Sequence, residues 1–233
     1  MKVLVMGSDG RQGKRYCSII ENSVNNKEVL RHDFLDDETD LVQKVKDAYA
    51  VIIATPTHLH EEHLRLIGMM RGQTTGTGLR VLMEKPAAMT LDGVKRMRKF
   101  AKERCLDLCM VNQYQYALEH AATAQGKDPE EANGTTFYDY YMSGTDGLAW
   151  DCIQLIGLAK GRIKLSNQSP VWRCAINGIV LNRSDIDQSY VDMIMDFLGP
   201  RYLVWRAPMM EKVTRKVLEY EEQAGSNSHS GQK

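Results

Sequence analysis

Short apolar runs alternate with amphipathic segments through the first half of the chain. Runs typical of buried strands cover residues 3–6, 28–34, 50–54, 80–86 and 107–116. Helical spacing of apolar residues follows the first run and recurs over residues 41–48, 59–70 and 90–105. Strands that alternate with helices of this length predict an α/β domain with a doubly wound parallel sheet.

The same pattern predicts which helix faces are buried. The first helix presents Tyr16, Ile19 and Ile20 on one side, and Thr90 stands where it would cap the helix over residues 90–105. In the helix over residues 59–70, one apolar stripe is expected at Leu59, His63, Leu66, Ile67 and Met70.

The second half of the chain has a different order of elements. Strands are predicted over residues 134–144, 162–167 and 171–182. Helices are predicted near 117–126 and over 146–161, 184–199 and 207–223, with Ser184 as a cap and Pro208 in the first turn of the last helix. This order predicts a small α+β domain with a largely antiparallel sheet. We therefore expect a Rossmann domain at 1–116, a reduced substrate or oligomerisation domain at 117–222 and a flexible tail at 223–233.

Charge and composition disfavour several partners. The 233 residues carry 30 basic and 30 acidic side chains, so no net field attracts nucleic acid or an anionic membrane surface. No apolar run approaches the ~20 residues that cross a bilayer, and the N-terminal run is too short for a signal peptide, so we expect a cytoplasmic protein. The five cysteines form no C-x-x-C pair, which argues against disulfides and a structural zinc site.

A glycine-rich turn follows the first strand. Gly7, Gly10 and Gly13 stand at G-x-x-G-x-x-G, where a tight turn, close approach of a pyrophosphate and a helix N-terminus would coincide. Glycines at this spacing also occur as a plain strand-to-helix turn, and it is their place after the first strand that favours a dinucleotide.

The residue expected to contact the adenosine ribose is Asp33, about 20 residues after the turn. An acid there favours a free ribose 2′-hydroxyl, whereas Arg31 or Arg11 would suit a 2′-phosphate. The sequence leaves NAD and NADP open.

Three of the six histidines fall in "ATPTHLHEEH", residues 54–63. His58, His60 and His63 come close to the H-x-H-x-D-H signature of metallo-β-lactamase-like hydrolases, with Glu62 at the aspartate position. That interpretation requires further histidine and aspartate ligands, and the two later histidines lie in a helical segment and in the polar end of the chain. We therefore favour an arrangement with no metal at these histidines.

Together, three segments resemble the glucose-fructose oxidoreductase and inositol dehydrogenase family, written Gfo/Idh/MocA. They are "GSDGRQG" after the first strand, "AVIIATPTHLH", and "VLMEKPAAMT" with the distinctive E-K-P tripeptide. The resemblance covers residues 1 to about 116 and implies NAD or NADP in a crevice at the carboxyl ends of the strands. It places Glu84 near the nicotinamide ribose and Lys85 beside the reacting carbon, and it suggests a cis Lys85–Pro86 bond. It also places His60 and the Thr55–Pro56 turn at the border of the cofactor, which makes His60 the functional histidine of the segment.

The expected cofactor contacts come from the glycine turn, the ends of the following strands and the segment after the last strand. They are Gly7, Ser8, Asp9, Gly10, Arg11, Gln12, Gly13, Asp33, Thr55, Pro56, Thr57, His60, Glu84, Lys85 and Gln113.

Lys85 is the main catalytic candidate. A lysine at a strand end is also compatible with a solvated edge residue, but here it stands between Glu84 and Pro86, as in the family. A cation beside the substrate hydroxyl stabilises the alkoxide that develops as hydride leaves, and a lysine of lowered pKa takes part in proton transfer.

The second half lacks the histidine that serves members of the family as general acid/base. In the family's D-x-x-x-H pattern, Asp151 matches the aspartate with Leu155 at the histidine position, or Gln154 takes the histidine position with Trp150 at the aspartate. Glutamine binds a substrate oxygen but relays no proton near neutral pH. Asp151 and Gln154 therefore join Lys85 as catalytic candidates for altered chemistry.

Two functions remain open. The first is an NAD(P)-dependent oxidoreductase that transfers hydride to or from a small sugar- or polyol-like substrate. The second is an NAD(P)-binding sensor or interaction protein without catalysis. Under either function, an exposed sheet face in the second domain predicts a homo-oligomer.

Overall fold

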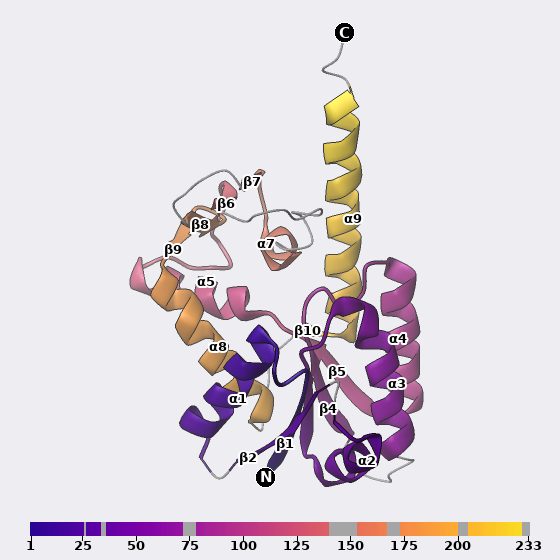
Figure 1. The fold of residues 1–233 in the computed structure, drawn as a ribbon. Coiled ribbons are helices and arrows are strands. Elements are labelled where there is room, and N and C mark those ends of the chain that lie inside the picture. Colours follow the sequence, from indigo (N-terminus) through magenta and orange to yellow (C-terminus); the bar gives the residue numbers. More distant parts are fainter. Residues whose placement is uncertain are drawn as a thin grey trace. The chain divides into compact units, whose positions relative to one another are not determined.

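The computed structural model describes residues 1–25, 27–33, 36–71, 78–139, 153–166, 173–199 and 205–229 (Figure 1). The chain forms two compact units. The first combines Met1–Val111 with Met193–Glu211, and the second combines Asn112–Asp192 with Lys212–Lys233. No helix among the described residues is long and apolar enough to span a membrane.

The first unit is built on a six-stranded sheet in the order β10-β5-β4-β3-β1-β2. The first five strands in the chain are mutually parallel, and the short β10 lies antiparallel to β5. Central strands such as β3 are continuously apolar because helices cover both faces of the sheet. The strands are β1 (Lys2–Met6), β2 (Glu28–His32), β3 (Ala50–Ile53), β4 (Leu79–Met83), β5 (Leu106–Met110) and β10 (Trp205–Arg206).

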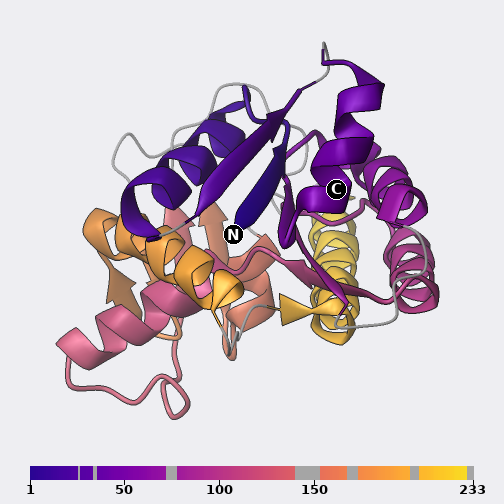
Figure 2. The ribbon, with the colours of Figure 1, turned by 90° about the horizontal axis from the view of Figure 1, so that it is seen from below.

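Helices lie on both sides of this sheet, as Figures 1 and 2 show. α1 (Arg11–Ser23) lies on one side, and α2 (Glu38–Asp47), α3 (His60–Arg71) and α4 (Leu91–Glu103) lie on the other. A 3₁₀ turn, η1 (Thr57–Leu59), leads into α3. This arrangement confirms the predicted doubly wound parallel sheet.

The second unit is built on a four-stranded sheet in the order β7-β6-β8-β9. Among the described strands of this sheet, only β6 and β7 are parallel to each other, so the predicted largely antiparallel sheet is confirmed. A tight hairpin joins β8 and β9 through Asn177 and Gly178, which both have positive φ. The strands are β6 (Thr136–Asp139), β7 (Ile163–Ser166), β8 (Arg173–Ile176) and β9 (Ile179–Leu181).

Four helices accompany these elements. α5 (Gln113–Ala124) contacts β9 and α7 (Ile153–Leu158). α8 (Arg183–Leu198) and α9 (Ala207–His229) each run from one unit into the other along the chain. Pro208 is the second residue of α9, as predicted.

Three predictions about helices were wrong. Residues 113–116 begin α5 instead of ending a strand. The "QYQY" segment alternates as a strand would, but it is the start of a helix that is buried on several sides. Ser184 lies inside the first turn of α8, and Asp185 caps the start by accepting from the Asn182 N–H at 2.7 Å.

The third concerns the buried stripe of α3. The buried residues are His60, Leu64, Ile67 and Gly68, so of the expected stripe only Ile67 is buried. A Cβ on Gly68 would lie 2.7 Å from the Phe100 ring, so α3 approaches α4 through a glycine. A search for large apolar residues overlooks a face made partly of glycine and histidine.

Helix α9 extends to His229, into residues that we expected to form a tail. β10 was not predicted because two residues are too few to leave a periodic pattern. The domain limits at 116 and 222 stay a prediction. In the two compact units, residues 193–211 belong with the first unit although they lie late in the chain.

Candidate cofactor and active site

The glycine turn holds the start of α1 at the carboxyl end of β1. Gly7 has φ of +77°, and its N–H donates to the His32 carbonyl at 2.9 Å. A Cβ on Gly13 would lie 2.0 Å from the Gly7 carbonyl oxygen, so only glycine allows α1 to pack this closely. The N–H groups of the first helical turn therefore lie at the sheet edge, where a helix N-terminus suits a phosphate.

The other residues of the turn differ in exposure. Ser8 is buried, whereas Asp9, Gly10 and Arg11 are exposed. Gln12 accepts a hydrogen bond from Arg15 at 3.4 Å.

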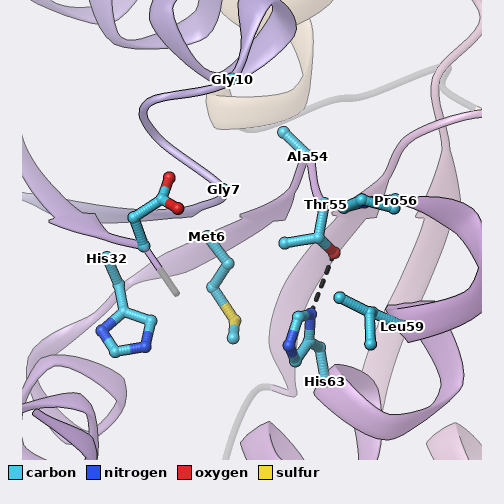
Figure 3. A pocket seen from close by; sticks show the side chains of 10 residues that line it. Met6, Gly7, Gly10, His32, Ala54, Thr55, Pro56, Leu59 and His63 are labelled. Carbon is cyan, nitrogen blue, oxygen red and sulfur yellow. Dashed lines mark hydrogen bonds between the residues drawn. The ribbon is translucent and has the colours of Figure 1, made fainter. Parts of the chain in front are cut away.

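A cavity of about 300 Å³ opens beside this turn (Figure 3). Its walls come from the carboxyl ends of β1, β2 and β3 and from the start of the following 3₁₀ turn and α3. Thr55 Oγ1 and His63 Nδ1 share a hydrogen bond of 2.9 Å across one wall. The lining residues are Met6, Gly7, Gly10, His32, Asp33, Ala54, Thr55, Pro56, Leu59 and His63.

Asp33 is fixed within this cavity. Its Oδ2 accepts the Asp9 N–H at 2.8 Å, which ties the end of β2 to the glycine turn. Arg31, the nearby candidate for a 2′-phosphate, instead pairs with Glu21 at 2.5 Å. A carboxylate therefore lines the cavity, and the Arg31 guanidinium is paired with Glu21.

The E-K-P corner follows β4. The Glu84 N–H continues the ladder to β3 by donating to the Ile53 carbonyl at 2.9 Å. Glu84 is only 6% exposed, and its Oε2 accepts the Lys85 N–H at 2.9 Å. The Lys85–Pro86 bond is cis, and Lys85 is partly buried.

Helix α1 also contacts this corner. The Tyr16 hydroxyl donates to Glu84 Oε1. Sequence reasoning assigned Tyr16 only to a packed face. Its spacing of three residues from Gly13, on the same helix face, is the signal that links it to the crevice.

His60 braces the two loops around the crevice. Its Nε2 lies 2.8 Å from the Thr55 carbonyl and its Nδ1 lies 3.1 Å from the Ala87 carbonyl. Burial lowers the pKa of His60, although the two carbonyl contacts favour the protonated ring. With both nitrogens facing carbonyl oxygens, His60 holds Thr55 and the segment after Pro86 together.

The other two histidines of the segment face different surroundings. The His58 side chain is exposed, and His63 contacts Thr55. Among the described residues, no group of three or more His, Cys, Asp or Glu side chains is arranged to hold a metal ion. The geometry thus gives no support to the metallo-hydrolase alternative.

Two further candidates, Gln113 and Gln154, lie in the second unit. Gln154 is fully buried, and its Oε1 accepts the Tyr114 N–H at 2.9 Å, which satisfies a donor at the start of α5. Its Nε2 donates to Gln113 Oε1, while Gln113 Nε2 donates to the Tyr190 hydroxyl at 3.1 Å. Both amides are therefore engaged inside this unit.

Asp151 and Trp150 lie outside the described residues, and Leu155 is fully buried. Burial strongly raises the pKa of Tyr114, which keeps its phenol neutral. At the two positions that align with the family's histidine, the second unit thus has the buried side chains of Gln154 and Leu155.

Residues 5–113 match the family model GFO_IDH_MocA, described as "Oxidoreductase family, NAD-binding Rossmann fold". No curated protein matches the chain.

Solved structures show the same fold over nearly the whole chain. The UDP-N-acetylglucosamine 3-dehydrogenase GnnA from Acidithiobacillus ferrooxidans is 13% identical with a TM-score of 0.68, covering 94% of this chain and 96% of that one. The WlbA (WbpB) dehydrogenase from Thermus thermophilus, solved with NAD and alpha-ketoglutarate, is 14% identical with a TM-score of 0.69 and 93% coverage of both chains. The scyllo-inositol dehydrogenase from Lactobacillus casei, solved with NAD(H) and scyllo-inositol, is 12% identical with a TM-score of 0.67, covering 94% and 95%.

Proposed function

Residues 5–113 belong to the Gfo/Idh/MocA family of NAD-binding Rossmann domains, and from this we propose that the protein is an NAD-dependent oxidoreductase. It transfers hydride between the cofactor and a hydroxyl or carbonyl carbon of a small sugar- or polyol-like substrate. Relatives of the same fold act on a nucleotide sugar and an inositol, by their names, which supports this substrate class.

One observation carries the proposal. The glycine turn after β1, the Thr55 turn after β3 and the Glu84–Lys85 corner after β4 lie at the carboxyl ends of parallel strands. These ends form one edge of the sheet, which is where α/β proteins bind dinucleotides.

The residues present fit such a cofactor. The α1 N-terminus suits the pyrophosphate because Gly13 lets the helix pack against Gly7. The cavity beside Asp33 suits the adenosine, with the carboxylate accepting from ribose hydroxyls. Glu84 suits the nicotinamide ribose in the same way.

Asp33 also favours NAD over NADP. A 2′-phosphate would face the carboxylate, and Arg31, which would offset that repulsion, pairs with Glu21.

When bound, the nicotinamide ring accepts or delivers the hydride. Lys85 is proposed to hold the substrate oxygen with its ammonium group and to stabilise the negative charge that develops there. The buried Glu84 holds the Lys85 backbone N–H and so fixes where the lysine side chain begins.

The test is a screen of sugars, polyols, inositols, nucleotide sugars and 2-oxo compounds with NAD and NADH, followed by absorbance of the reduced nicotinamide. Lys85→Met should lower hydride transfer by about 10² or more while NADH affinity stays near the wild-type value. Lys99→Met is the matched control because the Lys99 side chain is 80% exposed on α4. A fully active Lys85→Met on a substrate that the wild type uses would remove Lys85 from the chemistry.

A second candidate is an NAD-binding sensor without catalysis. It is favoured by the position of the family histidine, which is taken by buried Gln154 or Leu155 in the two possible alignments. Saturable NADH binding with no turnover of any compound in the screen would support this candidate over the enzyme.

A further inference from the structure

A phenol and a carboxylate that are 68 positions apart in the sequence meet between α1 and the end of β4. The Tyr16 hydroxyl donates to Glu84 Oε1, and the neighbouring Oε2 accepts the Lys85 N–H at 2.9 Å. Tyr16 is fully buried and Glu84 is 6% exposed. The carboxylate is therefore held from both sides.

The position of Tyr16 follows from the glycine turn. Gly13 sets how deeply α1 packs, since a Cβ there would meet the Gly7 carbonyl at 2.0 Å. Tyr16 is three residues further along the same helix face and therefore also points toward the sheet. One short helix thus carries both the predicted phosphate site and a contact to the E-K-P corner.

Because Glu84 is buried, its carboxylate depends on this hydrogen bond for stabilisation. A buried carboxylate is stabilised only by hydrogen bonds and charge partners, and donors to a charged group form the stronger hydrogen bonds. Glu84 receives one donor from a rigid aromatic side chain and one from the backbone. The phenol selects one orientation of the carboxylate among those that the backbone N–H alone would allow.

We propose that Tyr16 is a positioning residue for the nicotinamide half of the cofactor site, acting through Glu84. This inference rests on the proposed function, because it assumes that Glu84 contacts the nicotinamide ribose. Tyr16 holds Glu84 ready to accept from a ribose hydroxyl before the cofactor arrives, so less ordering is needed on binding. It also links α1, which binds the pyrophosphate, to the corner that carries Lys85.

The experiment compares two probes by calorimetric titration. NADH occupies the whole crevice, whereas ADP occupies only the adenosine and phosphate half. Tyr16→Phe removes the hydroxyl and keeps the ring, and should weaken NADH binding about tenfold, or about 1.4 kcal/mol. ADP affinity should stay within about twofold of wild type, the scatter expected for an uncoupled site.

Two further variants isolate the effect. Tyr49→Phe is the matched control, because Tyr49 is 37% exposed and lies before β3, and both affinities should be unchanged. Glu84→Gln should also weaken NADH binding, and adding Tyr16→Phe to it should cost less than Tyr16→Phe alone, as expected for two residues that act together.

Three results would overturn the inference. Equal losses of NADH and ADP affinity in Tyr16→Phe would mean that the phenol only supports the packing of α1. Unchanged NADH affinity would mean that Glu84 needs no help from Tyr16. A wild-type protein that binds ADP but not NADH would overturn both this inference and the proposed function.

Discussion

We propose that cofactor choice depends on Asp33. Among the described residues that line the cavity, it is the only acidic one, and its Oδ2 is fixed by the Asp9 N–H at 2.8 Å. A carboxylate held in place accepts from ribose hydroxyls and repels a 2′-phosphate.

We therefore predict that Asp33→Ser lowers the preference for NADH over NADPH by at least about tenfold. The check is the ratio of the two dissociation constants, measured for wild type, for Asp33→Ser and for Asp40→Ser. Asp40 is a suitable control because its carboxylate is 54% exposed on α2 and pairs with Lys44. An unchanged ratio in Asp33→Ser would show that the ribose lies elsewhere.

Single residues also show how far the sequence predicts the site. Gly13 was predicted as a cofactor contact from the glycine spacing, Asp33 from its distance along the chain from the glycine turn, and Glu84 from the resemblance to the family. The structure brings Gly7, Gly10 and Asp33 to one cavity. The sequence alone did not predict the Tyr16–Glu84 hydrogen bond, since nothing local relates residues 68 positions apart. Gln154 was also unclear, because its role depends on the buried start of α5.

At the scale of elements, the strand–turn–helix unit β1–α1 restricts most strictly which residues its turn can contain. A Cβ on Gly13 would lie 2.0 Å from a backbone oxygen, whereas a Cβ on Gly10 would lie 3.3 Å from its nearest neighbour, the Gly7 carbonyl oxygen. Gly13 is therefore required for packing, and we propose that Gly10 allows close approach of the cofactor.

We predict that Gly13→Ala lowers the free energy of unfolding by about 1–3 kcal/mol, the usual cost of overpacking. Gly10→Ala should change stability much less and should weaken NADH binding through its new methyl group. Urea unfolding and NADH titration of both variants provide the measurements. Equal stability of the two variants would contradict the packing role of Gly13.

The elements themselves were predicted with uneven success, for a physical reason. The parallel strands and their helices follow from continuous apolar runs and periodic spacing, both of which are local. The buried face of α3 was not predicted correctly, because His60 and Gly68 lie there in place of large apolar side chains. The short β10 is formed by pairing with β5 and has no pattern of its own.

The first unit should also lose stability in mild acid. Burial lowers the pKa of His32, His60 and His63 below the ordinary 6.5. In the pH range just below 6.5, the unfolded chain binds protons at these positions and the folded chain does not, so stability falls as pH falls. Above about pH 7.5 both states are neutral and the dependence disappears.

The prediction is a lower midpoint of thermal unfolding at pH 5.5 than at pH 7.5. His63→Gln should reduce this difference, and His58→Gln should not, because the His58 side chain is exposed. A midpoint independent of pH over this range would show that the three histidines accept protons as readily in the folded chain as in the unfolded one.

At the scale of the whole molecule, we propose that a second copy of the chain covers the sheet of the second unit, with Val180 in the contact. Val180 on β9 is 51% exposed, whereas its cross-strand neighbour Ala175 is buried and Phe137 on β6 is partly buried.

Light scattering should therefore give a mass that is a multiple of the 26.4 kDa chain, and Val180→Asp should reduce it toward the monomer. The substituted side chain would place a charge at the position of Val180 in the proposed contact. A wild-type mass of 26.4 kDa at micromolar concentration would contradict the proposed assembly.

We propose that this chain binds NAD along the carboxyl edge of its parallel sheet and uses the E-K-P corner at the nicotinamide end. A crystal structure of the protein grown with NADH tests it most directly. We expect electron density for the pyrophosphate over residues 10–13, for the adenosine beside Asp33 and for the nicotinamide ribose within hydrogen-bonding distance of Glu84. An empty crevice at saturating NADH, or a nucleotide bound away from the glycine turn, would contradict it.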